Sequence, residues 1–149
     1  MKQTIKEAFK YAVEHHKDGN IQEAERLYRL ILKSNPEHPD ANHNLGVIGA
    51  SLNKANVSLP FFQAAIKTNP NIEQYWVSYI EALIKVDDLD AAKEALVEAQ
   101  KNGTEDKIIS SLQAQIASRP ATGGDYDLSQ EQSKELLTHY NEGRFEAAA

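Results

Sequence analysis

The sequence lacks cysteine altogether, which excludes disulfide bonds, thiolate metal ligands and a cysteine nucleophile. It also lacks any apolar run close to the ~18 residues that a membrane-spanning helix requires. Its N-terminus has no apolar centre of the kind found in signal peptides; the apolar residues there recur at helical spacing. We therefore expect a cytoplasmic protein that makes no contact with a membrane.

Positive charge is also scarce. The 149 residues include 16 Lys and Arg against 22 Asp and Glu, a formal net charge of −6, and the basic residues form no tract. Proteins that bind nucleic acids need clustered Lys and Arg to neutralise phosphates, so no nucleic-acid partner is expected. The apolar fraction of 41% is typical of one soluble domain or a short array of units.

What the sequence does contain is an internal repeat of 34 residues. The stretch 18–36 returns as 52–70, and both copies end in Asn-Pro. A third copy opens at Asp87 and has Thr104 in place of the proline. A fixed period of this length indicates stacked helical hairpins. Matching columns hold small residues (Ala24, Ser58, Ala92) or large apolar ones (Tyr28, Phe62, Leu96).

These columns resemble the tetratricopeptide repeat family. The resemblance implies an all-α fold, a right-handed α-solenoid of stacked helix-turn-helix repeats. Residues 5–119 would hold three repeats (5–38, 39–72 and 73–106) and a capping helix (107–119), because a repeat cannot bury its own outer face. The residues that match the family's signature are Tyr11-Ala12, Gly19-Asn20, Ala24, Tyr28 and Pro36, then Leu45-Gly46, Phe62, Ala65 and Pro70, then Trp76, Tyr79, Ala92 and Ala99.

Some residues depart from the signature. Gly49 stands where the family has a tyrosine, Ser58 where it has an alanine, and Ile80 where it has a glycine. Pro60 would fall in the second turn of the fourth helix, where a proline costs about 3 kcal/mol. We therefore expect a shortened or kinked helix, and a late start with Ser58 as its N-cap is the less costly of the two solutions. Gly46 matches the signature and is expected where the two helices of repeat two cross closely.

The C-terminal residues form a separate part of the sequence. Residues 120–127 contain a proline and a Gly-Gly pair and are predicted to be a linker. Residues 128–149 restart the repeat pattern and end inside what would be its second helix. We interpret them as the truncated start of a further unit in a longer protein. Their uncovered apolar stripe would allow self-association through this helix.

No group of residues has the spacing that catalysis or metal binding requires. His15 and His16 are adjacent, so on a helix their side chains diverge. His38 and His43 flank a turn without cysteines or clustered carboxylates at ligand spacing. No nucleophile with a base and no phosphate-binding glycine loop occurs. We predict that this chain alone is not an enzyme and uses no cofactor and no metal.

In the tetratricopeptide family, the first helix of each repeat lines a concave groove that binds peptides. The resemblance thus implies a non-catalytic protein–protein interaction scaffold, whose partner is a protein or peptide. Lysines in repeat one favour a segment with a carboxylate near that end. The alternative interpretation of these positions is ordinary solvent-facing helix surface. The groove positions are Lys6, Phe9, Lys10, Val13 and Lys17, then Asp40, His43, Asn44, Val47 and Ser51, then Gln74, Val77, Ser78, Glu81 and Lys85.

The resemblance has two further implications. Chaperone-binding members of the family hold a C-terminal carboxylate with lysines and asparagines, and only Asn44 matches that pattern here. Affinity for peptides that end in Glu-Glu-Val-Asp is therefore not expected. The alternative function is an N-terminal recruiting or regulatory arm of a larger enzyme, since the restart after a linker resembles the arrangement ahead of glycosyltransferase or sulfotransferase domains in bacterial proteins.

Overall fold

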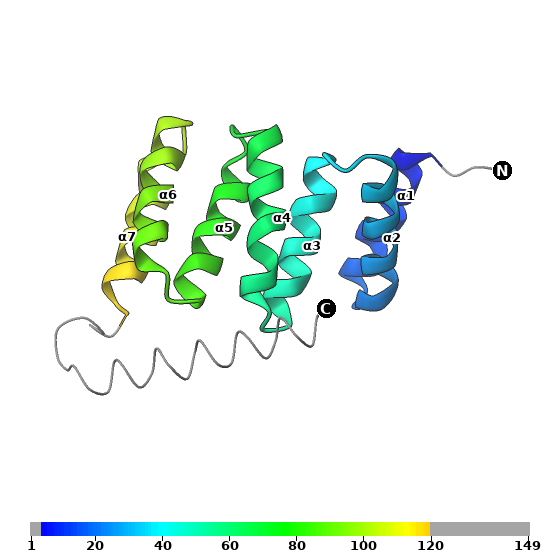
Figure 1. The fold of residues 1–149 in the computed structure, drawn as a ribbon, viewed down its shortest axis with the longest axis horizontal. Helices are drawn as coiled ribbons and strands as arrows, with labels where there is room; N and C mark the ends of the chain where they lie inside the picture. Colours follow the sequence, from blue (N-terminus) through cyan, green and yellow to red (C-terminus); the bar gives the residue numbers. More distant parts are fainter. Residues whose placement is uncertain (1–3, 120–149) are drawn as a thin grey trace. The chain divides into compact units, whose positions relative to one another are not determined.

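The computed structural model describes residues 4–119, in which all regular secondary structure is helical and no strand occurs. The predicted linker 120–127, the predicted unit 128–149 and its self-association lie outside the described residues. Within residues 4–119, seven helices follow one another through short turns (Figure 1). They are α1 (Ile5–Lys17), α2 (Ile21–Ser34), α3 (Pro39–Ser51), α4 (Ala55–Thr68), α5 (Glu73–Lys85), α6 (Leu89–Lys101) and α7 (Asp106–Ala117).

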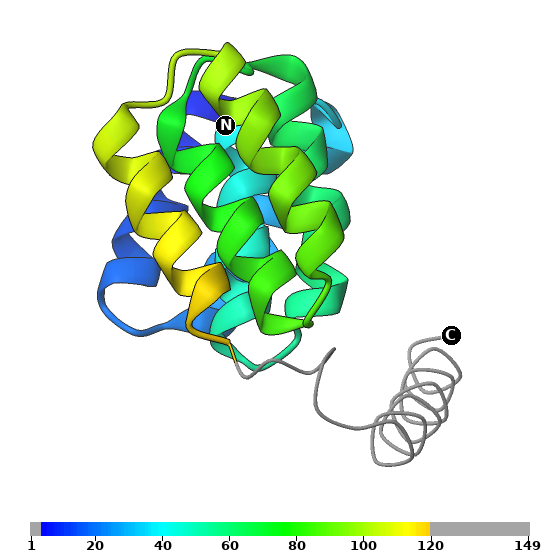
Figure 2. The same ribbon diagram turned by 90° about the vertical axis from the view of Figure 1, so that its left-hand side faces the viewer.

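The helices form a stacked array of hairpins. From α1 to α6 each helix packs against the next, and α3 also contacts α5 directly. Figures 1 and 2 show that the helices alternate between two layers, with α1, α3 and α5 on one side and α2, α4 and α6 on the other. Consecutive first helices of the hairpins therefore share one face. No helix among the described residues is long and apolar enough to cross a membrane.

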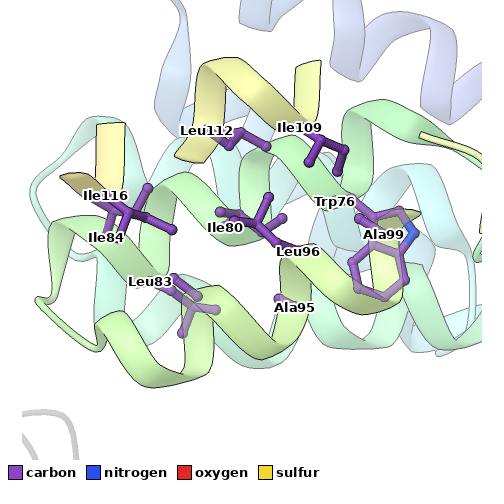
Figure 3. Packing of buried hydrophobic residues seen from close by; sticks show 11 residues of the cluster. Trp76, Ile80, Leu83, Ile84, Ala95, Leu96, Ala99, Ile109, Leu112 and Ile116 are labelled. Carbon is purple, nitrogen blue, oxygen red and sulfur yellow. The ribbon is translucent and has the colours of Figure 1, made fainter. Parts of the chain in front are cut away.

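The core lies between the two layers and is made of the apolar columns of the repeat. Ala12 and Ala24 are fully buried, and such small side chains let α1 and α2 approach each other closely. The cluster at the other end joins α5, α6 and α7, with Trp76, Ile80 and Leu112 among its buried side chains (Figure 3). α7 thereby covers apolar side chains of α5 and α6.

Gly46 lies where the structure needs a close approach. A Cβ atom on Gly46 would lie 2.5 Å from Cε1 of Phe62, far inside van der Waals contact. The ring of Phe62 is only 1% exposed, so it fills the space beside the glycine of α3. The predicted helix crossing in repeat two is therefore confirmed.

The predicted late start of α4 is wrong. The helix runs through its second turn with Pro60 inside it, and Ser58 is fully buried, not an N-cap. The hydroxyl of Ser58 donates to the carbonyl of Lys54 at 3.2 Å. A helix begun after Ser58 would lose its first turn, in which Ala55 and Ser58 are buried. Burial of these and the other core side chains of α4 offsets the ~3 kcal/mol cost of the proline.

Candidate functional site

The residues predicted to line a groove come from α1, α3 and α5, whose common surface we call the first-helix face. Its composition is mixed. Four of its side chains are apolar and half-buried: Phe9, Val13, Val47 and Val77. Asn44 and Ser78 are also half-buried, and His43 is buried with 9% exposure. The remaining residues are exposed: Lys6, Lys10, Lys17, Asp40, Ser51, Gln74, Glu81 and Lys85.

His43 connects α3 to α5. Its Nε2 lies 2.8 Å from the hydroxyl of Ser78, and its Nδ1 lies 3.2 Å from Oδ1 of Asn44. Its ring centroid lies 4.9 Å from that of Tyr75 and 5.6 Å from that of Phe62. Sequence analysis placed His43 among the residues that contact a ligand, but the structure directs its side chain toward neighbouring helices. Its position is that of a structural contact beneath the face.

Burial sets the protonation of this histidine. Removal from water lowers the pKa of His43, and the hydrogen bond with Asn44 and the charge of Asp40 only partly oppose that effect. Burial likewise lowers the pKa of His16 on α1. Both imidazoles are therefore expected to be neutral at neutral pH, when each can accept a proton on one ring nitrogen and donate on the other.

A chain of polar contacts continues from His43 toward α1. The side-chain amide of Asn44 donates to the hydroxyl of Tyr28 at 3.1 Å. That hydroxyl also lies 3.3 Å from Nδ1 of His16. Burial raises the pKa of Tyr28, so its hydroxyl stays protonated and can donate. Contacts between side chains thus run from His16 to Ser78 across four helices.

Two more contacts join α3 and α5. The hydroxyl of Tyr75 donates to the carboxylate of Asp40, and burial together with this hydrogen bond raises the pKa of Tyr75. Lys85 Nζ lies 3.5 Å from the carbonyl oxygen of Ala50, which it can reach as a donor. Residues 35 positions apart in sequence therefore lie side by side on this face.

Sequence reasoning missed the tyrosines of this network. Tyr28 was assigned to a core column and Tyr75 was not singled out, so neither hydroxyl was given a partner. The signal was available, because a buried tyrosine hydroxyl usually finds a hydrogen-bond partner. Asp40 and Asn44 on the adjacent helix are such partners.

The α1 end of the first-helix face is basic. Lys6, Lys10 and Lys17 are exposed, and none of them forms an ion pair with another residue of the described part. Ion pairs between described residues occur on α2 and α6. Phe9 lies beside these lysines, with its ring centroid 5.2 Å from that of His38. This end of the face therefore combines uncompensated positive charge with an apolar ring.

The side chains of this face have the composition of a contact surface. Within residues 4–119 no three His, Cys, Asp or Glu side chains lie together in a way that could hold a metal ion. The histidines of the face contact serine, asparagine and tyrosine, and none is paired with a carboxylate that would orient it as a base. Apolar side chains, lysines and amides suit contact with another polypeptide.

Comparison with known proteins identifies the fold. No protein-family model matches the sequence, and no curated protein matches it. Solved structures do match. The first TPR domain of Spaghetti (RPAP3), bound to the HSP90 peptide SRMEEVD, is 16% identical with a TM-score of 0.69, over 78% of this chain and 93% of that chain. The TPR2B domain of yeast Sti1, in a complex with pHsp70, is 20% identical with a TM-score of 0.70, over 78% and 98%.

A bacterial chaperone is similar as well. The Yersinia enterocolitica type III secretion chaperone SycD, in complex with a peptide of the translocator YopD, is 13% identical with a TM-score of 0.65, over 79% of this chain and 90% of that chain. At such identities the likeness shows the fold alone. The described helices thus have the all-α tetratricopeptide-repeat solenoid fold that the sequence pattern predicted.

Proposed function

We propose, on the basis of the tetratricopeptide fold, that this chain is a non-catalytic scaffold that binds an extended segment of a partner protein on the first-helix face. The observation that carries the proposal is the composition of that face, where half-buried apolar side chains lie beside lysines that have no ion pair within the described residues. In support, the similar structures of Spaghetti, Sti1 and SycD include a bound peptide or a partner in their complexes.

The apolar side chains of the face would contribute to the affinity by burying apolar surface, whatever the exact sequence of the partner. Phe9, Val13, Val47 and Val77 are only partly covered by the core. Each square ångström of apolar surface removed from water contributes about 25 cal/mol. A partner that places one apolar side chain against each helix would cover all of them, so an extended segment fits better than a compact ligand.

The charges favour a particular orientation of the partner. The face carries four lysines against Asp40 and Glu81, although the whole chain has a net charge of −6. The carboxylate of Asp40 already accepts a hydrogen bond from Tyr75. Acidic side chains or a terminal carboxylate of the partner would therefore lie near α1, where the lysines raise the local potential.

The polar contacts beneath the face would reduce the cost of binding. His43 and Tyr75 tie α3 to α5, and Tyr28 ties α2 to α3. Helices that are already held in register lose little conformational freedom when a ligand is added. In this proposal His43, Asn44 and Ser78 act by positioning the helices.

The test is selection of peptides from a random displayed library, followed by fluorescence anisotropy with the recovered peptides. We expect peptides that combine Asp or Glu with apolar residues. The variant Lys6→Glu/Lys10→Glu should weaken their binding at least tenfold, and added salt should weaken it in the unsubstituted protein, because exposed charges are screened. The matched control is Lys33→Glu/Lys93→Glu, which makes the same change of charge at exposed positions on α2 and α6.

The control should bind the peptides within twofold of the unsubstituted protein. Equal losses in both variants would mean that net charge alone matters, and would refute the first-helix face as the site. The predicted cytoplasmic setting is part of this proposal. No feature of residues 4–119 favours the alternative of an arm of a larger enzyme, which stays a prediction from the sequence.

A further inference from the structure

A small hollow opens between α2, α3 and α4, away from the first-helix face. Its volume is about 120 Å³, and none of its lining residues belongs to the face described above. Leu45 and Ile48 of α3, Leu52 just after α3 and Phe61 of α4 form its apolar walls. The hollow is a second candidate binding surface, which shares α3 but no lining residue with the first-helix face.

Gly49 explains why the hollow exists. In the 34-residue register its column is filled by Leu83 in repeat three, and that leucine is 3% exposed. Gly49 has no side chain, and the hydroxyl of Ser58 occupies the place beside it: a Cβ atom on Gly49 would lie 2.5 Å from Oγ of Ser58. Gly49 and Ser58 both line the hollow, and neither has a side chain long enough to fill it.

The size and walls of the hollow suit one ring. An engineered apolar cavity of about 150 Å³ is large enough to bind benzene. At the mouth of the hollow, Leu52 and Val57 are 50% and 45% exposed, so apolar surface continues beyond its walls. A free ring would fill the hollow and leave these two side chains uncovered. A ring carried on a polypeptide would cover them with its neighbouring backbone.

The rim carries more positive than negative charge. Arg29 and Lys54 line it together with Glu25. The guanidinium of Arg29 lies 3.1 Å from the carboxylate of Glu25 and 6.0 Å from the ring centroid of Phe61, which together orient it at the rim. Lys54 has no ion pair within residues 4–119. Its ammonium group is therefore available to a carboxylate of a partner.

We propose that this hollow binds a single aromatic side chain, Phe or Tyr, of a partner polypeptide in which acidic residues flank the ring. The ring lies against Leu45, Ile48 and Phe61, the adjacent backbone covers Leu52 and Val57, and a flanking carboxylate pairs with Lys54. The chain thereby has two separate contact surfaces for protein partners, the first-helix face and the hollow between α2, α3 and α4.

The test uses the tripeptide acetyl-Asp-Phe-Asp-amide, titrated into the full ¹⁵N-labelled chain and followed by NMR. We expect a millimolar dissociation constant, with shifts at the backbone amides of Gly49, Leu52 and Val57 and none at Val47 or Val77. Acetyl-Asp-Ala-Asp-amide and acetyl-Lys-Phe-Lys-amide should bind at least tenfold more weakly, because one lacks the ring and the other the carboxylates. Equal binding of either control peptide overturns the proposal.

Substitutions at the mouth locate the site. Leu52→Asp should weaken binding of acetyl-Asp-Phe-Asp-amide at least tenfold, and Lys54→Gln should weaken it about threefold. Val97→Asp is the matched control, because Val97 is 52% exposed and lies on α6. Unchanged affinity in Leu52→Asp, or an equal loss in Val97→Asp, overturns the assignment whether or not peptides bind to the first-helix face.

Two further measurements test whether the hollow instead binds a small molecule or a segment of the chain itself. Phenylacetate that binds tenfold more tightly than the tripeptide would make the hollow a small-molecule site. The chain itself contains the order Asp125-Tyr126-Asp127. If Tyr126→Ala strengthens binding of the tripeptide, this segment competes for the hollow and the partner is the chain's own sequence. Either result overturns the proposal; unchanged binding in Tyr126→Ala supports it.

Discussion

Replacing Gly46 with alanine tests the packing on which repeat two depends. The added Cβ would lie 2.5, 2.7 and 2.8 Å from Cε1, Cδ1 and Cζ of Phe62. Carbon atoms in contact are ordinarily about 3.5–4.0 Å apart, so the ring or α3 would have to move by about 1 Å. The ring is 1% exposed and surrounded by core, which leaves it little room to move.

Two opposing effects set the size of the change. Alanine in place of glycine inside a helix stabilises by about 0.5–1 kcal/mol. Overpacking of a buried contact destabilises by about 1–3 kcal/mol. We expect overpacking to win, with a net loss of roughly 1–2 kcal/mol and a fall of several degrees in melting temperature.

Urea denaturation of the Gly46→Ala variant measures this loss. Far-UV circular dichroism reports the helices, and fluorescence of Trp76, the single tryptophan, reports the cluster of α5, α6 and α7. The control is the same substitution in a Phe62→Leu background, where the clashing ring atoms are absent. There Gly46→Ala should be neutral or stabilising, a coupling that a double-mutant cycle resolves. A variant as stable as the parent, or no coupling to Phe62, would refute the close crossing of α3 and α4.

Three other expectations can be measured directly. The peptide SRMEEVD should show no micromolar affinity in a calorimetric titration, and micromolar binding would contradict this expectation. Asn44 is the single match to the carboxylate-binding pattern, and its side-chain amide already donates to Tyr28. The free energy of unfolding should be greatest above pH ~6.5 and should fall as the pH is lowered from there through the depressed pKa values of His43 and His16. The reason is that in this range the unfolded chain binds more protons than the folded one. Urea midpoints between pH 7 and 5 would show this fall, and a flat profile would mean that the two imidazoles are not buried as described. Pro60→Ala should stabilise by up to about 3 kcal/mol, because Pro60 is exposed within α4 and its replacement restores a backbone hydrogen bond; a less stable variant would mean that the proline favours the native helix.

The fold was predictable from the sequence because the repeat carries its information in residue size. Small residues at Ala24 and Ser58, and large ones at Tyr28 and Phe62, recur 34 positions apart where helices must approach or where space must be filled. Packing constraints of this kind act on each repeat separately, so several imperfect copies reinforce one another.

Pro60 shows where such reasoning fails. Judged locally, a proline in the second turn argues for a helix that begins after it. The register of the array decides otherwise, because the same helix must present Ala55, Ser58 and Phe62 to the core. Local preference is worth a few kcal/mol, and several buried side chains together exceed it. The sequence contained both signals but gave no measure of their relative size.

The first-helix face was predictable as a place, because the repeat register fixes which residues lie on α1, α3 and α5. The contacts that its polar side chains make were not predictable. Repeat spacing cannot tell that His43 turns toward Ser78, or that Asp40 accepts from Tyr75, since both depend on the separation of neighbouring hairpins. The residues of this face accordingly fall into two groups. Those engaged between helices set the shape of the face, whereas Lys6, Lys10 and Lys17 form no ion pair within the described residues. In the proposed function these three lysines are the ones that meet the partner.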